Sequence, residues 1–441
     1  MSFAFWLIGL FVSPPYAAAA PPAAPSGPTL TLAQAVEKAL ANQPTLRQAR
    51  ANTDAAEGRV EQARSGLLPQ VTATGSYQRT TANVSPRPGF SAVTTPPPWS
   101  LSTSYNFFNF GVNASQLIYD FGQTEGRKEA AESTREANRA TEQTTEVQIA
   151  FNVSRAYYQA LAQQELVMVG RDSVANQEKH VAQIEGLVKA GIRPDIDLAS
   201  VRTTLANAKV GLITAENGLA IARATLDQTI GARVAGFQLV DEPAPPVPGE
   251  GDSPEAIDGL VKTALSNRPE LVSLSRARKA QESSIEGIKG SYAPALGATA
   301  GATETGTGLD KLVPNWVVGA TLTWPLFQGG LTRGQLHEAR AVLSGIDAQV
   351  ETLRLQVRVD VEQAQLAVRG AQASGAAAEE ALVNAKDQLR LAEGRYSNGL
   401  GSVIELDDAQ LALTNAAALS VSARYNLATA RAQLRSALGR R

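Results

Sequence analysis

The sequence contains no cysteine. That absence excludes disulfide bonds, thiolate metal sites, cysteine nucleophiles and a lipid-modified N-terminal cysteine. The sequence also lacks an excess of basic residues, because 40 Lys and Arg are set against 42 Asp and Glu, for a formal net charge of -2. Such a chain has no positive field to hold a phosphate backbone, so we expect no nucleic-acid partner.

Histidine is scarce as well. The two histidines, His180 and His337, fall in stretches that we expect to be helical, and neither has a second histidine at metal-ligand spacing. We therefore expect both at the surface, with no metal site and no cofactor. The sequence has no H-E-x-x-H motif, no P-loop, no nucleophile elbow and no G-x-G-x-x-G after a buried strand. These absences predict that the protein is not an enzyme.

Long apolar runs are also missing, with one short exception. Residues 3–12 form an apolar run of the length of a signal-peptide core, and small residues follow at 17–20. We interpret residues 1–20 as a signal peptide, with a buried helix as the alternative because no Lys or Arg precedes the run. No later stretch approaches the roughly 20 apolar residues of a transmembrane helix, so we expect any membrane crossing to be made by a β-barrel.

The sequence contains an internal duplication. The segment A-L-A-N-Q-P at 39–44 recurs as A-L-S-N-R-P at 264–269, and I-Y-D-F-G-Q-T at 118–124 is matched by L-F-Q-G-G-L-T at 326–332. We divide the chain into a first repeat at 30–231, a connector at 232–253 and a second repeat at 254–439. Prolines and glycines at matched positions predict the order helix, helix, strand, strand, helix, helix in each repeat.

The last part of each repeat carries a coiled-coil pattern. Leu343, Ile346, Val350, Leu353 and Val357 recur at alternating spacings of three and four residues. A helix over 332–398 would be roughly 100 Å long at 1.5 Å per residue. A pore-less coiled-coil scaffold is one interpretation of this length. The strand segments between the helices favour a different interpretation, a protein that contributes strands to a membrane β-barrel.

Those segments alternate between apolar and small or polar residues. The predicted strands cover about 70–83 and 102–119 in the first repeat, and 295–306 and 315–326 in the second. Aromatic residues concentrate there, and we assign five to a membrane aromatic belt: Trp99, Tyr105, Phe107, Trp316 and Trp324. Four strands are too few to close a barrel, so closure requires other protomers. The alternative is a soluble four-stranded sheet with an aromatic core.

The duplicated order, the motifs N-Q-P, N-R-P and L-L-P-Q, and the turns A-G-I-R-P-D-I-D-L and N-G-L-G-S-V-I-E-L-D-D resemble the TolC family of outer-membrane efflux and export proteins. The resemblance implies a mostly α fold with a membrane β-barrel contribution. In it, a homotrimer forms one twelve-stranded β-barrel among outer-membrane lipids and an α-helical barrel in the periplasm. It further implies a passive conduit of a tripartite efflux pump or a type I secretion system, working with a periplasmic adaptor and an inner-membrane pump.

By the same resemblance, Glu405 and Asp408 match the acidic residues of a periplasmic aperture gate, where a trimer would place rings of three carboxylates that attract cations. Asp197 and Tyr396 match a latch that holds the aperture shut. Gly401 departs from the pattern, because the best-known latch carries an Arg there. The adaptor-docking tips would be Gly191, Ile192, Gly399 and Leu400.

Two acidic residues have a simpler explanation. Asp195 and Asp407 lie close after the predicted turns, where acidic side chains complement a helix N-terminus, so we favour helix capping for both. For the whole protein, an outer-membrane export channel is the leading hypothesis. A periplasmic adaptor is the alternative from a different class, although we expect an adaptor to have a lipoyl-like module and a single hairpin.

Overall fold

The computed structural model describes residues 29–81, 104–233, 236–247 and 254–441. The predicted signal peptide and Trp99 lie outside the described residues, as does the side chain of Tyr105. In chain order, the elements of the first repeat are β1 (Thr29–Leu30), α1 (Leu32–Asn42), α2 (Pro44–Ser65), β2 (Gln70–Thr81), β3 (Ser104–Tyr119), α3 (Gln123–Lys189) and α4 (Asp195–Ile230), and the connector contains β4 (Gln238–Leu239). Those of the second are α5 (Pro254–Asn267), α6 (Pro269–Gly290), β5 (Ala295–Gly306), β6 (Val313–Thr323), α7 (Leu331–Ser397) and α8 (Val403–Ala437).

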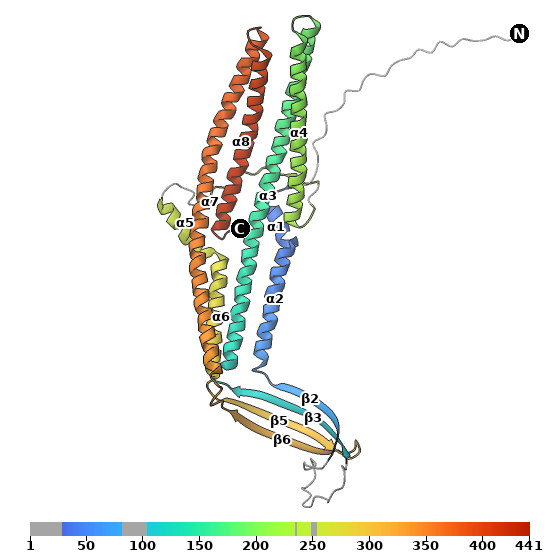
Figure 1. The fold of residues 1–441 in the computed structure, drawn as a ribbon, viewed down its shortest axis with the longest axis vertical. Coiled ribbons are helices and arrows are strands. Elements are labelled where there is room, and N and C mark those ends of the chain that lie inside the picture. Colours follow the sequence, from blue (N-terminus) through green and yellow to red (C-terminus); the bar gives the residue numbers. More distant parts are fainter. Residues whose placement is uncertain (1–28, 82–103, 234–235, 248–253) are drawn as a thin grey trace, which may run out of the picture.

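This order confirms the duplicated helix, helix, strand, strand, helix, helix arrangement. The longest helix of each repeat, α3 or α7, has 67 residues, which corresponds to about 100 Å. Figure 1 shows the sheet at one end of the elongated molecule and the hairpins α3/α4 and α7/α8 reaching the other end. None of the helices in the described ranges combines the length and apolarity needed to cross a membrane.

The large sheet is antiparallel, with the strand order β2-β3-β5-β6. Its register gives it two chemically different faces. Val112 pairs with Ala302, which in turn pairs with Trp316, so these three residues share an apolar face. On the opposite face, Gly111 pairs with Thr303, which pairs with Asn315. We call the second surface, made mainly of Thr, Asn, Ser and Gly, the polar face of the sheet.

The register corrects one of the aromatic assignments. Phe107 pairs with Gln78, whereas Phe108 pairs with Tyr77. Because successive side chains of a strand point to opposite faces, Phe108 shares the face of Trp316 and Phe107 lies on the polar face. The sequence pattern does not show which face Phe107 occupies, because residues 107 and 108 are both phenylalanine. Aromatic residues therefore fall at both odd and even positions of the strand. Trp316 is 82% exposed, and Trp324 lies just beyond β6 at 58% exposed.

The helices next to the sheet form one layer, in which α3 packs between α2 and α6, and α7 packs against α6. Glycines allow α3 and α6 to approach closely. A Cβ added at Gly126 would lie 2.7 Å from the Cα of Gly287, and a Cβ at Gly290 would lie 2.8 Å from the backbone nitrogen of Gln123. The layer therefore depends on small residues where the two helices leave the sheet.

Two apolar cores lie midway along the helices. One packs α1, β1 and β4 against α3 and α4, and the other packs α5 against α7 and α8. Tyr157 anchors the first core, because its hydroxyl lies 2.7 Å from the carbonyl oxygens of Leu30 and Val240 and 3.0 Å from the amide nitrogen of Val240. Burial raises the pKa of Tyr157 to about 12. These contacts hold the short segments at the middle of the long helices.

Candidate functional site at the helix tips

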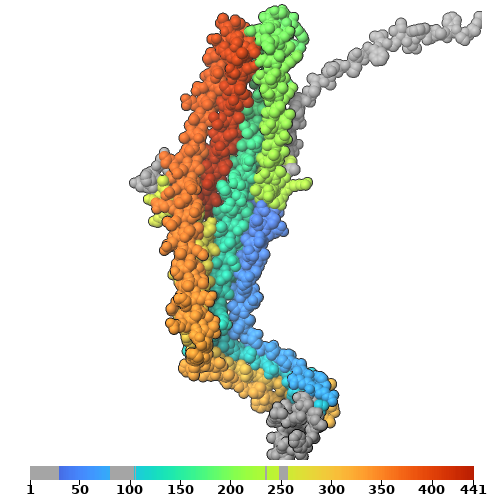
Figure 2. Space-filling model, in the orientation of Figure 1, coloured from blue at the N-terminus to red at the C-terminus, as the bar shows by residue number. Residues whose placement is uncertain are grey.

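Each long hairpin ends in a glycine turn. Gly191 and Gly399 have φ values of 73° and 74°, in the left-handed region that favours glycine. Beside them, Ile192 is 67% exposed and Leu400 is 75% exposed. The two tips lie next to each other at one end of the molecule (Figure 2). Both predicted docking turns thus present an apolar side chain to solvent.

The predicted latch residues are linked indirectly. The Tyr396 hydroxyl is buried and has no hydrogen-bond partner among the described residues, so the direct bond to Asp197 is absent in the protomer. Arg193 lies between them: its guanidinium carbon is 5.1 Å from the Tyr396 ring centroid, and its Nη1 is 3.8 Å from Asp197 Oδ2. A cation over an aromatic face is attracted to the ring. Arg193 belongs to the quoted turn motif, but sequence reasoning gave it no role.

The predicted gate residues occupy the start of α8. Glu405 and Asp408 are both exposed, one helical turn apart on one face. Glu405 Oε1 pairs with Arg395 Nε at 3.0 Å, an ion pair across the turn between α7 and α8. Ser402 caps the helix by accepting a hydrogen bond from the Glu405 amide. Within the protomer, Glu405 is therefore compensated by Arg395, and Asp408 is the more available charge.

A ladder of polar pairs joins the hairpins behind the tips. Going toward the tip, Ser173 on α3 meets Thr414 on α8 at 3.4 Å, and Gln177 donates to Gln410. His180 Nε2 then lies 3.9 Å from Asp407 Oδ1. Each step along α3 is matched by an equal step back along α8, which is the register of an antiparallel coiled-coil seam. We call these three pairs the seam ladder.

The seam ladder corrects two sequence-based predictions. His180 is not at the surface, since its side chain is only 3% exposed. Asp407 is not a helix cap, because Ser402 has that role and the Asp407 carboxylate turns toward His180 and Thr204. The heptad pattern of α3 could have predicted that His180 is buried, because His180 lies at the seam position before Ile184. Ile184 is fully buried in a cluster with Val403. The partner helix could not be read from that pattern.

Burial sets the protonation of this region. It lowers the pKa of His180, and the Asp407 charge opposes that shift only partly. It raises the pKa of Asp407, against the effects of His180 and of the hydrogen bond from Thr204. It also raises the pKa of Tyr396. In each case burial shifts the pKa in the direction that favours the neutral form over the charged form.

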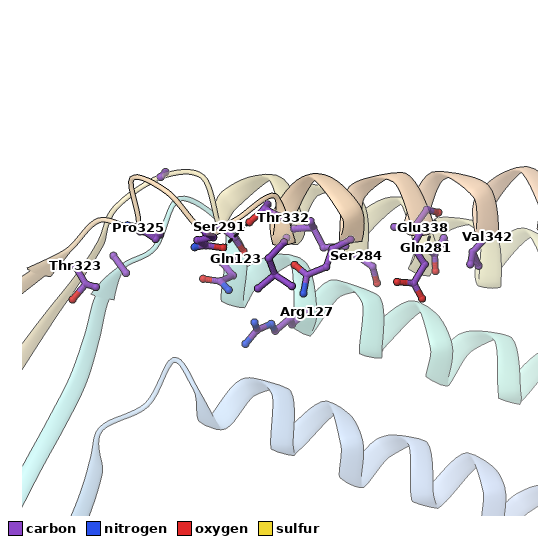
Figure 3. A pocket seen from close by; sticks show the side chains of 18 residues that line it. Gln123, Arg127, Gln281, Ser284, Ser291, Thr323, Pro325, Thr332, Glu338 and Val342 are labelled. Carbon is purple, nitrogen blue, oxygen red and sulfur yellow. Dashed lines mark hydrogen bonds between the residues drawn. The ribbon is translucent and has the colours of Figure 1, made fainter.

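A cavity of about 710 Å³ lies at the other end of the helices, between α3, α6 and α7 (Figure 3). Thr323 and Ala295, which line it, belong to the polar face of the sheet by their register. Arg127, Glu338 and Gln281 supply much of the remaining polarity. The cavity thus continues the polar face onto the helices. The described residues contain no cluster of three or more His, Cys, Asp or Glu that could hold a metal ion.

The model of the outer membrane efflux protein family matches residues 35–232 and 260–440, which is most of the chain and covers both repeats. The chain belongs to the outer membrane efflux protein family. It is therefore an efflux channel protein of the outer membrane, with a large helical portion in the periplasm, as the sequence analysis predicted. The periplasmic adaptor and the pore-less scaffold find no support in this result.

Individual relatives are distant but cover most of the chain. The probable efflux pump outer membrane protein TtgC of Pseudomonas putida is 25% identical over 379 residues, which cover 84% of this chain and 75% of TtgC. The outer membrane protein TolC of Vibrio cholerae is 22% identical over 382 residues, covering 85% of this chain and 83% of TolC. The crystal structure of VceC from Vibrio cholerae superimposes with a TM-score of 0.76 at 20% identity, covering 92% of this chain and 96% of VceC.

Proposed function

We propose that this chain is one protomer of a homotrimer that forms the outer-membrane conduit of a tripartite efflux pump. A single observation supports this most strongly: an open four-stranded sheet with one apolar and one polar face is joined directly to helices of about 100 Å. Three such sheets would form a twelve-stranded barrel with the apolar faces toward lipid and the polar faces inside. The cavity beside Arg127 then belongs to the inner wall.

The edges of the protomer support a trimer. β2 and β6 are the edge strands of the sheet, and unpaired strand edges are rarely left open. Large apolar side chains are also exposed along the two hairpins, and we assign them to contacts with the neighbouring copies. On α4 they are Ile196, Val210, Ile213 and Ile221, and on α7 they are Leu355, Leu366, Val383 and Leu391. In this arrangement the chain closes only as an oligomer.

The helix tips are the gate of this conduit. Three copies would place Asp408 and Glu405 in rings of three carboxylates, which favour cations and allow multivalent cations to block the aperture. Arg193, between Asp197 and Tyr396, would hold the hairpins together as the latch. Arg193 thus supplies from the first turn the cation that Gly401 does not supply from the second.

The exposed tips would dock a periplasmic adaptor. Ile192 and Leu400 project from turns that Gly191 and Gly399 make possible, and both are apolar and solvent-exposed. An adaptor hairpin covering them would connect the conduit to an inner-membrane pump that supplies the energy. Transport through this chain is then passive, without catalysis by the chain itself.

The test is to purify the chain in detergent, measure the mass of the oligomer, and record conductance in a planar bilayer. A trimer with discrete channels that multivalent cations block is the expected result. A monomer or dimer without channel activity would overturn the proposal. Asp408→Asn provides the matched variant, since it should keep the trimer and the channel while weakening the block.

A further inference from the structure

Unpartnered buried polar atoms gather where the two hairpins meet. Among the described residues, Gln177 Oε1, His180 Nε2, Tyr396 OH and Asp407 Oδ1 are all buried and lack a hydrogen-bond partner. They come from α3, α7 and α8, and the His180 and Tyr396 rings are 5.8 Å apart in an edge-to-face arrangement. A buried polar atom without a partner costs free energy, so the contact between the hairpins is less stable at this junction than a fully hydrogen-bonded contact would be.

The geometry of His180 and Asp407 shows what could change. Nε2 and Oδ1 are 3.9 Å apart, which is too far for a hydrogen bond but close enough for Coulombic attraction between a protonated His180 and an ionised Asp407. The other carboxylate oxygen of Asp407 is held by Thr204 of α4 at 3.5 Å. The pair therefore links three of the four helices of the hairpins, namely α3, α4 and α8.

We propose that His180 and Asp407 form a buried proton-binding site that makes the contact between the two hairpins sensitive to pH, so that acidification separates the helix tips. This inference rests on the proposed gate and adds a regulatory input to it. The separated tips would expose His180 to water, whereas the closed tips keep it 3% exposed against α8.

Other charges surround the pair. Glu393 and Tyr396 of α7 face His180, and α3 adds the neutral amides of Gln177 and Gln183. Asp408 of α8 raises the pKa of Asp407. The charges of Arg193, in the first turn, and Asp197, on α4, influence the pKa of Tyr396. The acidic groups Asp407 and Glu393 raise the pKa of His180, but burial lowers it by more. The net effect of the closed contact is to lower the pKa of His180.

The sign of the proposed pH effect is that of His180, because the raised pKa of Asp407 favours the closed contact in acid and acts in the opposite sense. An exposed histidine takes up a proton near pH 6.5, and His180 in the closed contact does so only at lower pH. Its contribution to closure is thus fully present above about pH 6.5 and decreases as the pH falls below that value. With one His180 per protomer, the equilibrium of each protomer shifts by at most about tenfold per pH unit.

The experiment uses the absence of cysteine in the chain. Cysteines introduced at the exposed tip residues, Ile192→Cys and Leu400→Cys, carry spin labels, and pulsed electron resonance measures the distances between tips at about pH 7.5 and about pH 5.5. Both values lie above the ordinary pKa of exposed carboxylic acids, about 4. We expect the population with widened tips to increase at the lower pH.

Three variants identify the responsible group. His180→Gln keeps a polar side chain of similar size and should abolish the pH response, whereas His337→Gln replaces the only other histidine, which is exposed, and should leave it intact. Asp407→Asn removes the charge that favours protonated His180 in the closed contact, so the tips should separate more fully at the lower pH. A role limited to packing would not change the pH dependence.

Several results would overturn the proposal. The spin-labelled chain that retains His180 and Asp407 already tests it. Tip distances that are the same at both pH values, or that shorten in acid, would contradict the proposal. A response that persists in His180→Gln would place the sensor elsewhere. The distances do not depend on ion flow, so a chain that never conducts would contradict the proposed channel while the His180-dependent distance change could still be observed.

Discussion

Arg193 stacks on Tyr396, with the guanidinium carbon 5.1 Å from the ring centroid, and joins the turn of the first hairpin to the end of α7 in the second. Asp197 Oδ2, 3.8 Å from Arg193 Nη1, holds the guanidinium in place. The connection between the hairpins thus depends on an arginine that the sequence motif contains but does not single out. Its removal should affect the closed state directly.

Arg193→Ala is expected to increase the resting conductance of the channel, because the cation over the Tyr396 ring and the pair with Asp197 are lost together. A cation–π contact of this kind contributes about 0.5–1 kcal/mol at an exposed site, so we expect a rise of a few-fold. Single-channel recording measures it. Arg202→Ala is the matched control, since Arg202 lies on the same hairpin and pairs with Glu185 at 4.0 Å; an equal rise there would remove Arg193 from the latch.

Tyr396→Phe should leave the resting conductance close to that of the unaltered channel. Within the described ranges the Tyr396 hydroxyl has no hydrogen-bond partner, so the substitution removes no such bond and keeps the ring beneath Arg193. Tyr396→Ala removes the ring and should increase the conductance. Bilayer recording of both variants distinguishes a ring-mediated latch from a hydroxyl-mediated one, because the latter predicts opening in Tyr396→Phe as well.

Asp408→Asn should weaken block by multivalent cations more than Glu405→Gln does. Arg395 already compensates Glu405 at 3.0 Å, whereas Asp408 is exposed on the same helix face. Arg395→Gln should strengthen the block, since it releases the charge of Glu405. Titration of a trivalent cation against single-channel current gives the three affinities. Identical affinities in all variants would exclude this helix face from the gate.

Gly126→Ala should destabilise the protein, because the new Cβ would lie 2.7 Å from the backbone of Gly287 where α3 crosses α6. Inserting a methyl group into a tight packing site costs about 1–3 kcal/mol. Gly58→Ala is the matched control: Gly58 lies inside α2 with nothing within 4 Å of a Cβ, so the same change should stabilise the helix by about 0.5–1 kcal/mol. Thermal unfolding followed by circular dichroism measures both, and a stable Gly126→Ala would show that the two helices can separate without cost.

Tyr157→Phe should lower stability by about 1–3 kcal/mol, because the buried carbonyl of Leu30 and the partly buried carbonyl of Val240 lose their shared donor. The pH dependence has a defined sign. Burial raises the pKa of Tyr157 from 10.0 to about 12, so its contribution is fully present below pH 10 and is lost as the pH rises through about 12. Unfolding midpoints measured between about pH 8 and pH 12 should therefore converge for the two proteins.

Much of the fold could be predicted from local patterns. The duplication, the turns at Gly191 and Gly399, and the long helices are recorded in residue types and spacings, because a left-handed turn requires glycine and a seam requires apolar residues at heptad spacing. The face of Phe107 could not be predicted, because adjacent phenylalanines fit either parity and only the pairing with Gln78 decides between them.

The site divides in the same way. The positions of Glu405 and Asp408 on one face of α8 follow from their spacing in the sequence. The pairing of His180 with Asp407, the link from Arg193 to Tyr396, and the compensation of Glu405 by Arg395 were decided by the tertiary structure. Each of these contacts joins side chains from different elements, and local periodicity fixes which face of a helix a residue occupies but not which helix lies against that face.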